Sequence, residues 1–375
     1  MSLYFIDLGT AMPKTLKSMP TADGFRMPGE FEPHRGCWML WPQRPDNWRL
    51  AAGPAQYAWV AVAAAIAASE PLTVGASARQ FARARRMLPK SVRVVRMASN
   101  DAWMRDVGPT FVTDRKGRRR GVDWRFNAWG GLQGGVYWPW TLDDRVARQV
   151  LVHEKSARYR APIILEGGAI HVDGQGTLIT TEECLLHGNR NPKLSRSKLE
   201  VLLRAYLGVQ KIIWLGRGVY NDETDGHVDN LCCFVKPGVV CLTWTNDRRD
   251  PMYRIVRDAE ARLKAARDAR GRRFKIHKLY QPGPFYMTAD EARGVIDQAG
   301  SKPRKPGERL AGSYVNFYIG NKAIVMPLLD AKRDGAAIGK LRKLFPRRRV
   351  VGVPAREILL GGGNIHCITQ QVPRG

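Results

Sequence analysis

The sequence predicts an α/β fold in which four or five ββαβ units are arranged round a common axis. Two observations predict it. A hairpin, a helix and a strand follow one another in the same order three times between residues 165 and 353, and no linker-like stretch divides the 375 residues. Units that recur at roughly 50–90 residues bury their faces against their neighbours. We therefore expect one domain over residues 1–375, with an ordinary globular composition of 44% hydrophobic and 25% charged residues.

Each of the three clear repeats opens on a predicted hairpin with a glycine in its turn: Gly174, Gly238 or Gly320. Strand-forming runs on both sides of a glycine-containing turn are typical of hairpins. Leucines at helical spacing predict the helix that follows the first hairpin. In chain order, the hairpin, helix and strand of the three repeats are predicted at 165–186, 195–206 and 211–215; at 227–244, 251–270 and 274–279; and at 313–328, 336–345 and 349–353.

The N-terminal region follows the repeat less regularly. A final strand at 364–370 would close the array by pairing with the early part of the chain. An ordinary open α/β sheet, in which three repetitions coincide by chance, remains the alternative. The N-terminal region is predicted to hold strands at 37–41, 72–75 and 92–96, helices at 57–68 and 78–88, and a hairpin of 110–113 with 122–126.

Neither a targeting segment nor a disulfide framework is expected. The first residues carry no charged region ahead of their few apolar residues, unlike a secretory signal. The longest apolar run, 59–68, is too short to cross a bilayer and suits a buried helix. The six cysteines lack disulfide-type spacing and contain no CxxC pair typical of zinc. We expect a cytoplasmic protein with no membrane segment and no metal, in which adjacent Cys232 and Cys233 are one core and one surface thiol.

The chain is strongly basic, because 61 Lys and Arg against 34 Asp and Glu give a net charge of +27. Such a charge attracts polyanions such as nucleic acid. The basic residues gather at 115–120, 262–273, 302–309 and 340–349, on several predicted elements and without a nucleic-acid-binding motif. We expect weak, nonspecific polyanion attraction. A polyanion-binding protein on an enzyme scaffold is the alternative from a different functional class.

Reactive side chains recur near the starts of the predicted hairpins. Asp106 precedes the hairpin that begins at residue 110, and Glu166 lies at the start of the next one. His227 and Asp229 open the third hairpin, and Cys367 lies in the final strand. If the units are related by rotation, equivalent strand starts converge on the axis. We therefore expect these five side chains to face one central pocket.

Together these residue types suit a reaction at the carbon of a guanidinium group. A guanidinium is planar and always charged, and its donors match carboxylates, so Asp106 and Asp229 would hold it from two sides. The Cys367 thiolate would attack the carbon, because a nearby cation lowers the pKa of a thiol. His227 would protonate the departing ammonia and then activate water. On a strand, His227 and Asp229 would point to the same face.

The segment 221–230 supports a cationic ligand, because it carries four acidic residues and no Lys or Arg in a chain of net charge +27. A solvated acidic loop is the ordinary explanation of such a segment. Each of the other candidate residues also has an ordinary structural explanation when it is taken singly. The complementary set, which a degenerate scaffold has no physical need to keep, is what favours catalysis.

Six segments resemble those of agmatine deiminases, in the order of that family and over nearly the whole chain. No single segment is specific, but the combination is. The segments are MPGEFEPHRGCWMLWPQRPDNW, NDAWMRDVGPTFV, WRFNAWGG, LEGGAIHVDGQGTLITTEECLLHGNRNP, NDETDGHVDNLCCF and GGGNIHCITQQVP.

The resemblance implies a pentein fold, with five ββαβ modules round a pseudo-fivefold axis, as in arginine and peptidylarginine deiminases. It implies hydrolysis of agmatine to N-carbamoylputrescine and ammonia, in polyamine (putrescine) biosynthesis and without a cofactor. By motif position, Cys367 corresponds to the nucleophile that forms a covalent amidino-thioether. His227 corresponds to the general acid and base, and Asp106 and Asp229 to the carboxylates that hold the guanidinium. Glu166 corresponds to a glutamate that orients the histidine.

Two further residues match the substrate-binding positions of that family. Glu223 corresponds to an acidic residue suited to the distal amine of agmatine, and Trp103 to an aromatic wall. We expect a homodimer. A deiminase of free arginine or of peptidyl-arginine remains the alternative, although free arginine brings a carboxylate that needs a cation in the pocket. The acidic segment 221–230 favours an amine-bearing substrate instead, and the resemblance does not explain the high basicity.

Overall fold

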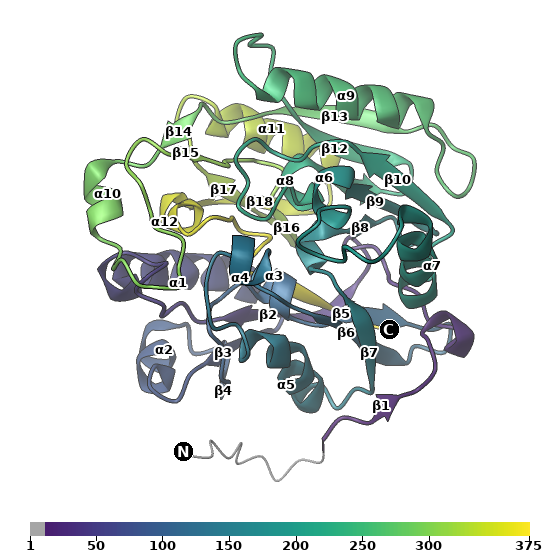
Figure 1. The fold of residues 1–375 in the computed structure, drawn as a ribbon, viewed down its shortest axis with the longest axis horizontal. Coiled ribbons are helices and arrows are strands. Elements are labelled where there is room, and N and C mark those ends of the chain that lie inside the picture. The colour runs from purple at the N-terminus through teal and green to yellow at the C-terminus, as the bar shows by residue number, and fades with distance from the viewer. Residues whose placement is uncertain (1–11) are drawn as a thin grey trace.

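The computed structural model describes residues 12–375, with the strands toward the middle of the molecule and the longer helices on the outside (Figure 1). Within this range the strands form five sheets of three or four strands and one sheet of two. In each of the five larger sheets, a parallel strand extends an antiparallel pair. A helix links the two parallel strands each time, which is the connection that parallel pairing requires. The predicted ββαβ pattern is therefore confirmed.

Two sheets contain the early strands. One sheet holds β2 (His34–Leu40), β3 (Leu72–Ala76), β4 (Arg93–Arg96) and β19 (Gln370–Pro373), connected by α1 (Gly53–Ala67) and α2 (Phe81–Met87). The other sheet holds β1 (Thr15–Leu16), β5 (Thr110–Thr113), β6 (Arg119–Arg125) and β7 (Arg158–Ile164), with α5 (Val146–His153) between β6 and β7. The short helices here are η1 (Thr21–Asp23), η2 (Leu50–Ala52), α3 (Met104–Val107), α4 (Gly131–Gly134) and η3 (Asp143–Arg145). Antiparallel pairing of β19 with β2 confirms the predicted closure against the early chain.

The other three large sheets follow the predicted repeats. The first holds β8 (His171–Val172), β9 (Thr177–Thr181) and β10 (Lys211–Leu215), with η4 (Gly167–Ala169), α6 (Glu182–Leu185) and α7 (Arg196–Leu207). The second holds β11 (Cys232–Lys236), β12 (Val239–Trp244) and β13 (Lys275–Tyr280), with α8 (Val228–Leu231) and α9 (Met252–Ala265). The third holds β16 (Tyr318–Ile319), β17 (Ala323–Leu328) and β18 (Arg349–Pro354), with α11 (Asp334–Leu344). The pair β14 (Phe285–Tyr286) and β15 (Arg309–Leu310) lies near α10 (Ala289–Arg293) and α12 (Arg356–Leu360).

The helix predicted over 251–270 ends earlier, at Ala265. Asp268 explains the early end, because its carboxylate accepts hydrogen bonds from the backbone of Arg270 and Arg272, both at 2.9 Å. An aspartate that bonds nearby backbone in this way favours a turn over a continued helix. The helix boundary was therefore predicted five residues too late.

The strand predicted over 364–370 begins only at Gln370. The preceding residues form a turn in which the Thr369 N–H donates to the carbonyl of His366 at 3.1 Å. Cys367 therefore lies in this turn and not on a strand. The turn holds the thiol next to the pairing of β19 with β2.

Helix α1 belongs to the hydrophobic core. The segment Leu50–Ala67 is the one in the described range that is long and apolar enough, by length and composition alone, to cross a membrane. In this fold Trp59, Val62 and Ile66 are fully buried, and the Trp59 indole N–H donates to the carbonyl of Leu40 at 2.7 Å. One face of α1 is thus buried as predicted, whereas residues such as Tyr57 on its other face are exposed.

All six cysteines are buried and free. The expectation that Cys232 and Cys233 are one core and one surface thiol is wrong. The two side chains do point to opposite sides of β11, but Cys232 packs in one hydrophobic cluster and Cys233 in another. Strand β11 is thus covered on both faces.

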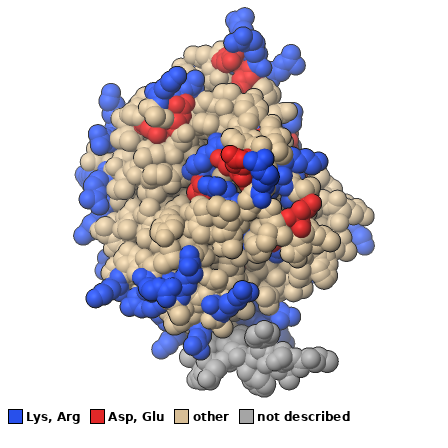
Figure 2. Space-filling model, turned by 90° about the vertical axis from the view of Figure 1, so that its left-hand side faces the viewer, with Lys and Arg blue, Asp and Glu red and all other residues tan. Residues whose placement is uncertain are grey.

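Lys and Arg side chains form several separate groups on the face drawn in Figure 2, with smaller groups of carboxylates between them. The predicted cluster 115–120 occupies the turn between β5 and β6, where Lys116 and Arg118 are exposed. The cluster 340–349 spans the end of α11 and the start of β18, where Arg342 and Lys343 are exposed. Both clusters lie on the outer surface, as predicted.

Candidate active site

The chain segments that precede an antiparallel edge strand in each of four sheets, namely β5, β8, β11 and β19, bring the predicted site residues together. Asp106 lies on α3 before β5, and His227 and Asp229 lie at α8 before β11. They meet at Gly168 of η4. A Cβ atom there would lie 2.5 Å from His227 Nδ1, 2.9 Å from Asp106 Oδ1 and 3.1 Å from Asp229 Oδ2. Only glycine fits at this meeting point, so the predicted convergence is present.

His227 and Asp229 do not lie on a strand, and this part of the prediction is wrong. They belong to the single turn α8, where His227 is the cap residue with φ −51° and ψ 138°. Residues two apart on a helical turn point in different directions. His227 consequently faces Asp106 and Glu166, whereas the Asp229 carboxylate faces the turn that carries Cys367.

The His227 ring lies between two carboxylates. Its Nε2 is 3.4 Å from Glu166 Oε2, and its Nδ1 is 3.8 Å from Asp106 Oδ1, without a hydrogen-bond partner among residues 12–375. Burial lowers the pKa of His227, but the Asp106 charge and the contacts with Cys184 and Glu166 outweigh it, so the pKa lies well above the ordinary value. The ring is therefore an imidazolium at neutral pH, with one nitrogen open to the site.

Arg190 holds the glutamate behind this histidine. The Arg190 Nε–H donates to Glu166 Oε1 at 2.8 Å, and both side chains are fully buried. Burial raises the pKa of Glu166, but the Arg190 charge and the His227 contact lower it overall. Arg190 also donates to Asp225 Oδ2 and to the carbonyl of Thr224, both at 2.8 Å. Arg190 therefore links the segment 221–230 to Glu166 by hydrogen bonds.

Asp106 is fixed by two donors. The Gly168 backbone N–H donates to Oδ1 at 3.0 Å, and the Trp129 indole N–H donates to Oδ2 at 3.1 Å. Burial raises the pKa of Asp106 to about 6, with the His227 charge lowering it and the Asp229 charge raising it. This carboxylate is oriented, and a further cation beside it would strengthen its ionised form.

The Cys367 thiol lies against Asp229. Its Sγ is 3.7 Å from Asp229 Oδ2 and 3.4 Å from Asn316 Oδ1. Burial raises the pKa of the thiol well above its ordinary value, and the Asp229 and Asp106 charges add to this effect. Asp229 Oδ1 is buried without a hydrogen-bond partner in the described part of the chain. An acceptor of this kind suits a ligand with N–H donors.

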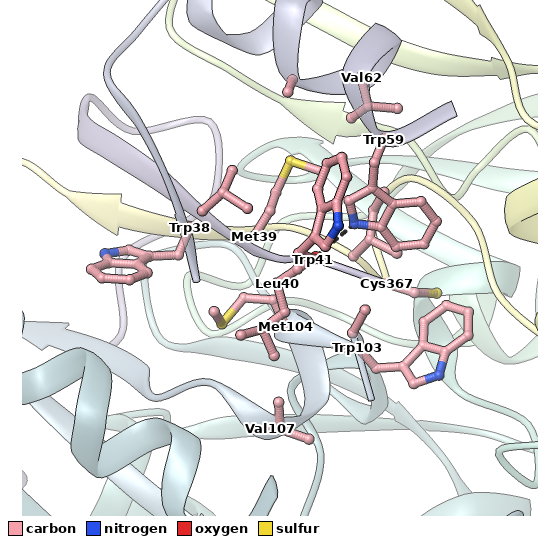
Figure 3. Close-up of a cluster of buried hydrophobic side chains, with 14 of the residues drawn as sticks. Trp38, Met39, Leu40, Trp41, Trp59, Val62, Trp103, Met104, Val107 and Cys367 are labelled. Atoms are coloured by element: carbon pink, nitrogen blue, oxygen red, sulfur yellow. Dashed lines mark hydrogen bonds between the residues drawn. The ribbon is translucent and has the colours of Figure 1, made fainter. Parts of the chain in front are cut away.

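The thiol opens onto a small cavity of about 20 Å³. Its wall includes Trp103, whose indole N–H donates to Asp101 Oδ2 at 3.0 Å. Figure 3 shows Trp103 and Cys367 near each other at the edge of a buried hydrophobic cluster. The cavity is lined by Trp103, Asp106, Trp129, Val136, Glu223, Thr224, Gly361, Gly362, Gly363 and Cys367.

Glu223 lies at this cavity, as predicted, but the surrounding charge differs from the prediction. Arg304 Nη1 is 2.6 Å and Lys302 Nζ 3.2 Å from Glu223 Oε1. Burial raises the pKa of Glu223, but these two cations lower it overall. The segment 221–230 was expected to form an acidic island, yet basic residues from a distant loop reach it. The pairing of Glu223 with Arg304 and Lys302 could not be predicted, because these residues are far apart in the sequence.

A larger hollow of about 570 Å³ lies between the end of β13 and α11. Its lining includes Lys278, Lys332, Arg333 and Lys340, but none of its lining residues, all in the described range, is Cys or His. It offers no thiol, and Asp247 is the single acidic residue of its lining, so it has no opposed carboxylate pair. The smaller cavity at Cys367 is therefore the better candidate for chemistry.

One group at the site has the residue types of a metal centre: ligand atoms of Glu166, Cys184 and His227 lie within 4.8 Å of one another. The Arg190 guanidinium bonded directly to Glu166 places a positive charge beside this group. A metal cation would be repelled there. The arrangement suits proton transfer better than metal binding.

Several site residues were not predicted from the sequence: Gly168, Trp129, Arg190, Asn316 and His366, whose Nδ1 lies 2.8 Å from Asp229 Oδ2. His366 stands immediately before Cys367, and Arg190 and Trp129 lie within segments already singled out by their resemblance. Their positions beside or within these motifs could have marked them as site residues. No sequence signal pointed to Asn316, since an asparagine in a predicted hairpin is common and does not by itself indicate a functional site.

This site combines a thiol, an imidazolium and opposed carboxylates round a narrow cavity, which defines a cysteine-dependent site for a planar cation. A model of the family described as Porphyromonas-type peptidyl-arginine deiminase matches residues 26–373. The chain therefore belongs to this family.

Individual relatives are similar over nearly the whole chain. The agmatine deiminase of Pseudomonas aeruginosa (strain LESB58) is 59% identical over 358 residues, 95% of this chain and 97% of the relative. The agmatine deiminase of Ectopseudomonas mendocina (strain ymp) is 56% identical over 361 residues, 96% of this chain and 98% of the relative. The solved structure of the agmatine deiminase of Enterococcus faecalis has a TM-score of 0.93 at 46% identity and covers 96% of this chain and 99% of that chain. The resemblance to agmatine deiminases is confirmed.

Proposed function

We propose that this protein hydrolyses agmatine to N-carbamoylputrescine and ammonia through a covalent amidino-cysteine intermediate. The observation that carries the proposal is the position of the Cys367 thiol, 3.7 Å from Asp229 Oδ2, in a site where Asp229 and Asp106 both approach Gly168. The similarity to proteins named agmatine deiminases supports the choice of substrate. We further propose that this reaction serves putrescine formation from arginine.

The two aspartates would hold the substrate guanidinium. Asp106 is oriented by Gly168 and Trp129, and Asp229 keeps Oδ1 free of partners in the described chain. Charge-assisted bonds between a guanidinium and carboxylates are strong and directional. Held in this way, the guanidinium presents its carbon to Cys367 above its plane.

Substrate binding would activate the nucleophile. In the free protein the burial of the site and the charges of Asp229 and Asp106 keep Cys367 as a thiol. A bound guanidinium neutralises those carboxylates, so the thiol pKa falls and the proton leaves to solvent. The thiolate then forms a bond to the guanidino carbon.

His227 would move the protons of the later steps. Its imidazolium protonates the departing nitrogen as the carbon–nitrogen bond breaks and ammonia leaves. The neutral ring then takes a proton from water, which adds to the carbon of the amidino-thioether. The carbon–sulfur bond breaks as the adduct's hydroxyl becomes the ureido carbonyl, and the proton of that hydroxyl returns the departing Cys367 sulfur to the resting thiol. The open Nδ1 of His227 supports this role.

The wider setting is also proposed. We infer that the five larger sheets form the five modules of a pentein propeller in a single domain, because all five share the same strand pairing. We further propose a cytoplasmic homodimer that needs no cofactor. Weak polyanion attraction by the basic surface is proposed as a separate property, supported by the exposed clusters 115–120 and 340–349.

Free arginine and peptidyl-arginine remain the competing substrates. The family description names peptidyl-arginine, and Arg304 places a cation beside the cavity, where a substrate carboxylate would be attracted. Arg304 is however already bound to Glu223, and its Nη2 donates to the carbonyl of Gly361 at 2.9 Å. The narrow cavity also favours a slim, extended substrate over a peptide.

The test is ammonia release from agmatine, arginine and an arginyl peptide in parallel. We expect kcat/KM for agmatine to exceed that for arginine and for the peptide by at least about 10²-fold. A wrong substrate would leave polar groups of the site without hydrogen-bond partners, which lowers its kcat/KM. Mass spectrometry of a quenched reaction would show the amidino adduct on Cys367. Equal rates on arginine, or turnover without an adduct, would contradict the proposal.

A further inference from the structure

A buried chain of three ionisable side chains, Asp229, His366 and Glu30, continues from the site beyond Asp229. His366 Nδ1 is 2.8 Å from Asp229 Oδ2, and His366 Nε2 is 2.8 Å from Glu30 Oε2. All three side chains are almost completely buried. The ring thus bridges two carboxylates, one of which belongs to the candidate active site.

Glu30 is itself rigidly placed. Its Oε1 accepts the backbone N–H of Ile319 at 2.9 Å, and Arg105 Nη2 lies 3.9 Å from Oε2. Burial raises the pKa of Glu30, but the charges of His366 and Arg105 lower it far below the ordinary value. Glu30 is therefore an anion with a fixed position.

The charges that face the His366 ring balance in favour of an imidazolium. Burial and the Arg105 charge lower the pKa of His366, but Glu30 and Asp229 raise it above the ordinary value overall. The stacked ring of His171, 6.0 Å away, is neutral, since burial lowers its pKa to about 4. A protonated His366 donates from both nitrogens, one bond to each carboxylate.

A metal site is the competing explanation, because ligand atoms of Glu30, His171 and His366 lie within 4.8 Å of one another. The hydrogen bonds argue against it. His171 Nδ1 accepts the backbone N–H of Phe234 at 3.3 Å, so the proton of the neutral ring is on Nε2, the nitrogen that faces Glu30. His366 already uses both nitrogens. Neither ring offers a lone pair to a cation.

We propose that Glu30 and His366 are positioning residues that hold the Asp229 carboxylate, through its Oδ2, in the orientation in which it meets the substrate guanidinium. The inference rests on the proposed function, because it gives Asp229 its role in binding. The bond from His366 prevents rotation of the Asp229 carboxylate, and Glu30 keeps His366 in the form that makes this bond. The same bond leaves Asp229 Oδ1 as the unpartnered acceptor.

Two substitutions at one position separate the two bonds of His366. His366→Asn keeps an N–H donor near the Nδ1 position, which faces Asp229. His366→Gln keeps a donor near the Nε2 position, which faces Glu30. We expect His366→Asn to retain at least about tenfold more kcat/KM for agmatine than His366→Gln, since a hydrogen bond to a charged group is worth about that factor. Equal losses in the two variants would overturn the proposal.

Glu30→Gln tests the charge, and Glu70→Gln is its matched control. Glu70 is also buried and paired with a buried histidine, His34, at 3.1 Å, but it contacts Tyr318 and Asn321 instead of Asp229. We expect Glu30→Gln to lose roughly 10- to 100-fold in kcat/KM, with a raised KM. The loss should grow with rising pH, because His366 without Glu30 loses its proton at lower pH. Glu70→Gln should stay within about threefold of wild type.

An NMR titration of ¹⁵N-labelled histidines gives a readout that needs no turnover. In wild type and in Glu70→Gln, the His366 ring should remain protonated to a higher pH than in Glu30→Gln. If Glu30→Gln leaves the His366 titration unchanged, or if Glu70→Gln reproduces its kinetic loss, the inference is wrong. A wild-type protein that does not hydrolyse agmatine would instead contradict the proposed function. The titration would then still decide whether Glu30 sets the protonation of His366.

Discussion

Two buried histidines flank the candidate site, and their surroundings are alike in composition but different in geometry. His227 lies between Asp106 and Glu166, with Arg190 behind the glutamate. His366 lies between Asp229 and Glu30, with Arg105 beyond the glutamate. Each side is thus a histidine, two carboxylates and an arginine.

The difference is in the hydrogen bonds. Both nitrogens of His366 are 2.8 Å from a carboxylate oxygen. His227 has one long contact of 3.4 Å, and its Nδ1 has no partner in the described chain. A ring that is bonded at both ends can fix a neighbour, whereas a ring with an open nitrogen can exchange a proton with a ligand. The same set of residue types therefore serves proton transfer around His227 and the positioning of Asp229 around His366.

The thiol between the two sides should be indispensable. Cys367→Ser is expected to abolish turnover of agmatine while the melting temperature stays near that of wild type, because the hydroxyl replaces a far better nucleophile of similar size. Steady-state kinetics and a thermal melt on the same protein check this. Activity within tenfold of wild type at normal stability would remove Cys367 from the mechanism.

The comparison of the histidines predicts unequal losses. His227→Asn should reduce kcat by about 10²- to 10⁴-fold, the usual contribution of a general acid or base. His366→Asn should lose less, because it keeps a donor to Asp229. Measuring kcat and KM of both variants side by side tests the division of roles. A larger kcat loss at His366 would reverse it.

The two aspartates should both affect binding and rate. Asp106→Asn and Asp229→Asn each leave one side of the guanidinium without a charge-assisted partner, at a cost of about 1.5–3 kcal/mol in kcat/KM. Agmatine affinity measured in a Cys367→Ala background separates binding from chemistry. A variant with near-normal kcat/KM would show that its aspartate does not hold the guanidinium.

Removing the negative charge at Asp229 should also change the thiol itself. Since the burial of the site and the Asp229 charge raise the pKa of Cys367, Asp229→Asn should lower this pKa relative to wild type. The pH dependence of alkylation by iodoacetamide reports the thiolate, with Cys367→Ala as the background of the other buried cysteines. Unchanged or later alkylation in Asp229→Asn would contradict the assigned charge effect.

Salt should affect the site least. Binding of a nonspecific DNA duplex, if the exposed clusters 115–120 and 340–349 produce it, should weaken steeply with salt as counterions are displaced. The kcat/KM for agmatine should respond far less, because enclosed charge pairs are screened less than exposed ones. A parallel salt titration measures both. If both fall with the same slope, the outer clusters contribute to the electrostatics of the site.

Much of this site was predictable because its residues occupy equivalent places in a repeat. Asp106, Glu166, His227 and Cys367 each stand shortly before an antiparallel edge strand of a different sheet, so their equivalent positions in the repeat indicated that they would lie together. The prediction that His227 and Asp229 share a strand face failed, since α8 precedes β11. A single helical turn is too short to leave a periodic signal.

The contacts that support the site were less predictable. Glu30 and Arg304 reach their partners across large sequence distances, 336 residues from Glu30 to His366 and 81 from Glu223 to Arg304. Sequence patterns report local periodicity and carry no information on such pairing. The resemblance covered the segments that contain Glu30 and His366, but it did not show that they contact each other.

The place of the thiol in the chain has a consequence for the newly made protein. Cys367 follows every other predicted site residue in sequence, and the turn that carries it leads directly into β19, which pairs with β2. Long-range pairing of this kind forms late in folding. Ribosome-bound or partly folded chains therefore already possess both carboxylates and His227 but lack an anchored nucleophile. We therefore expect a chain in which β19 has not yet paired with β2 to be unreactive toward guanidino compounds.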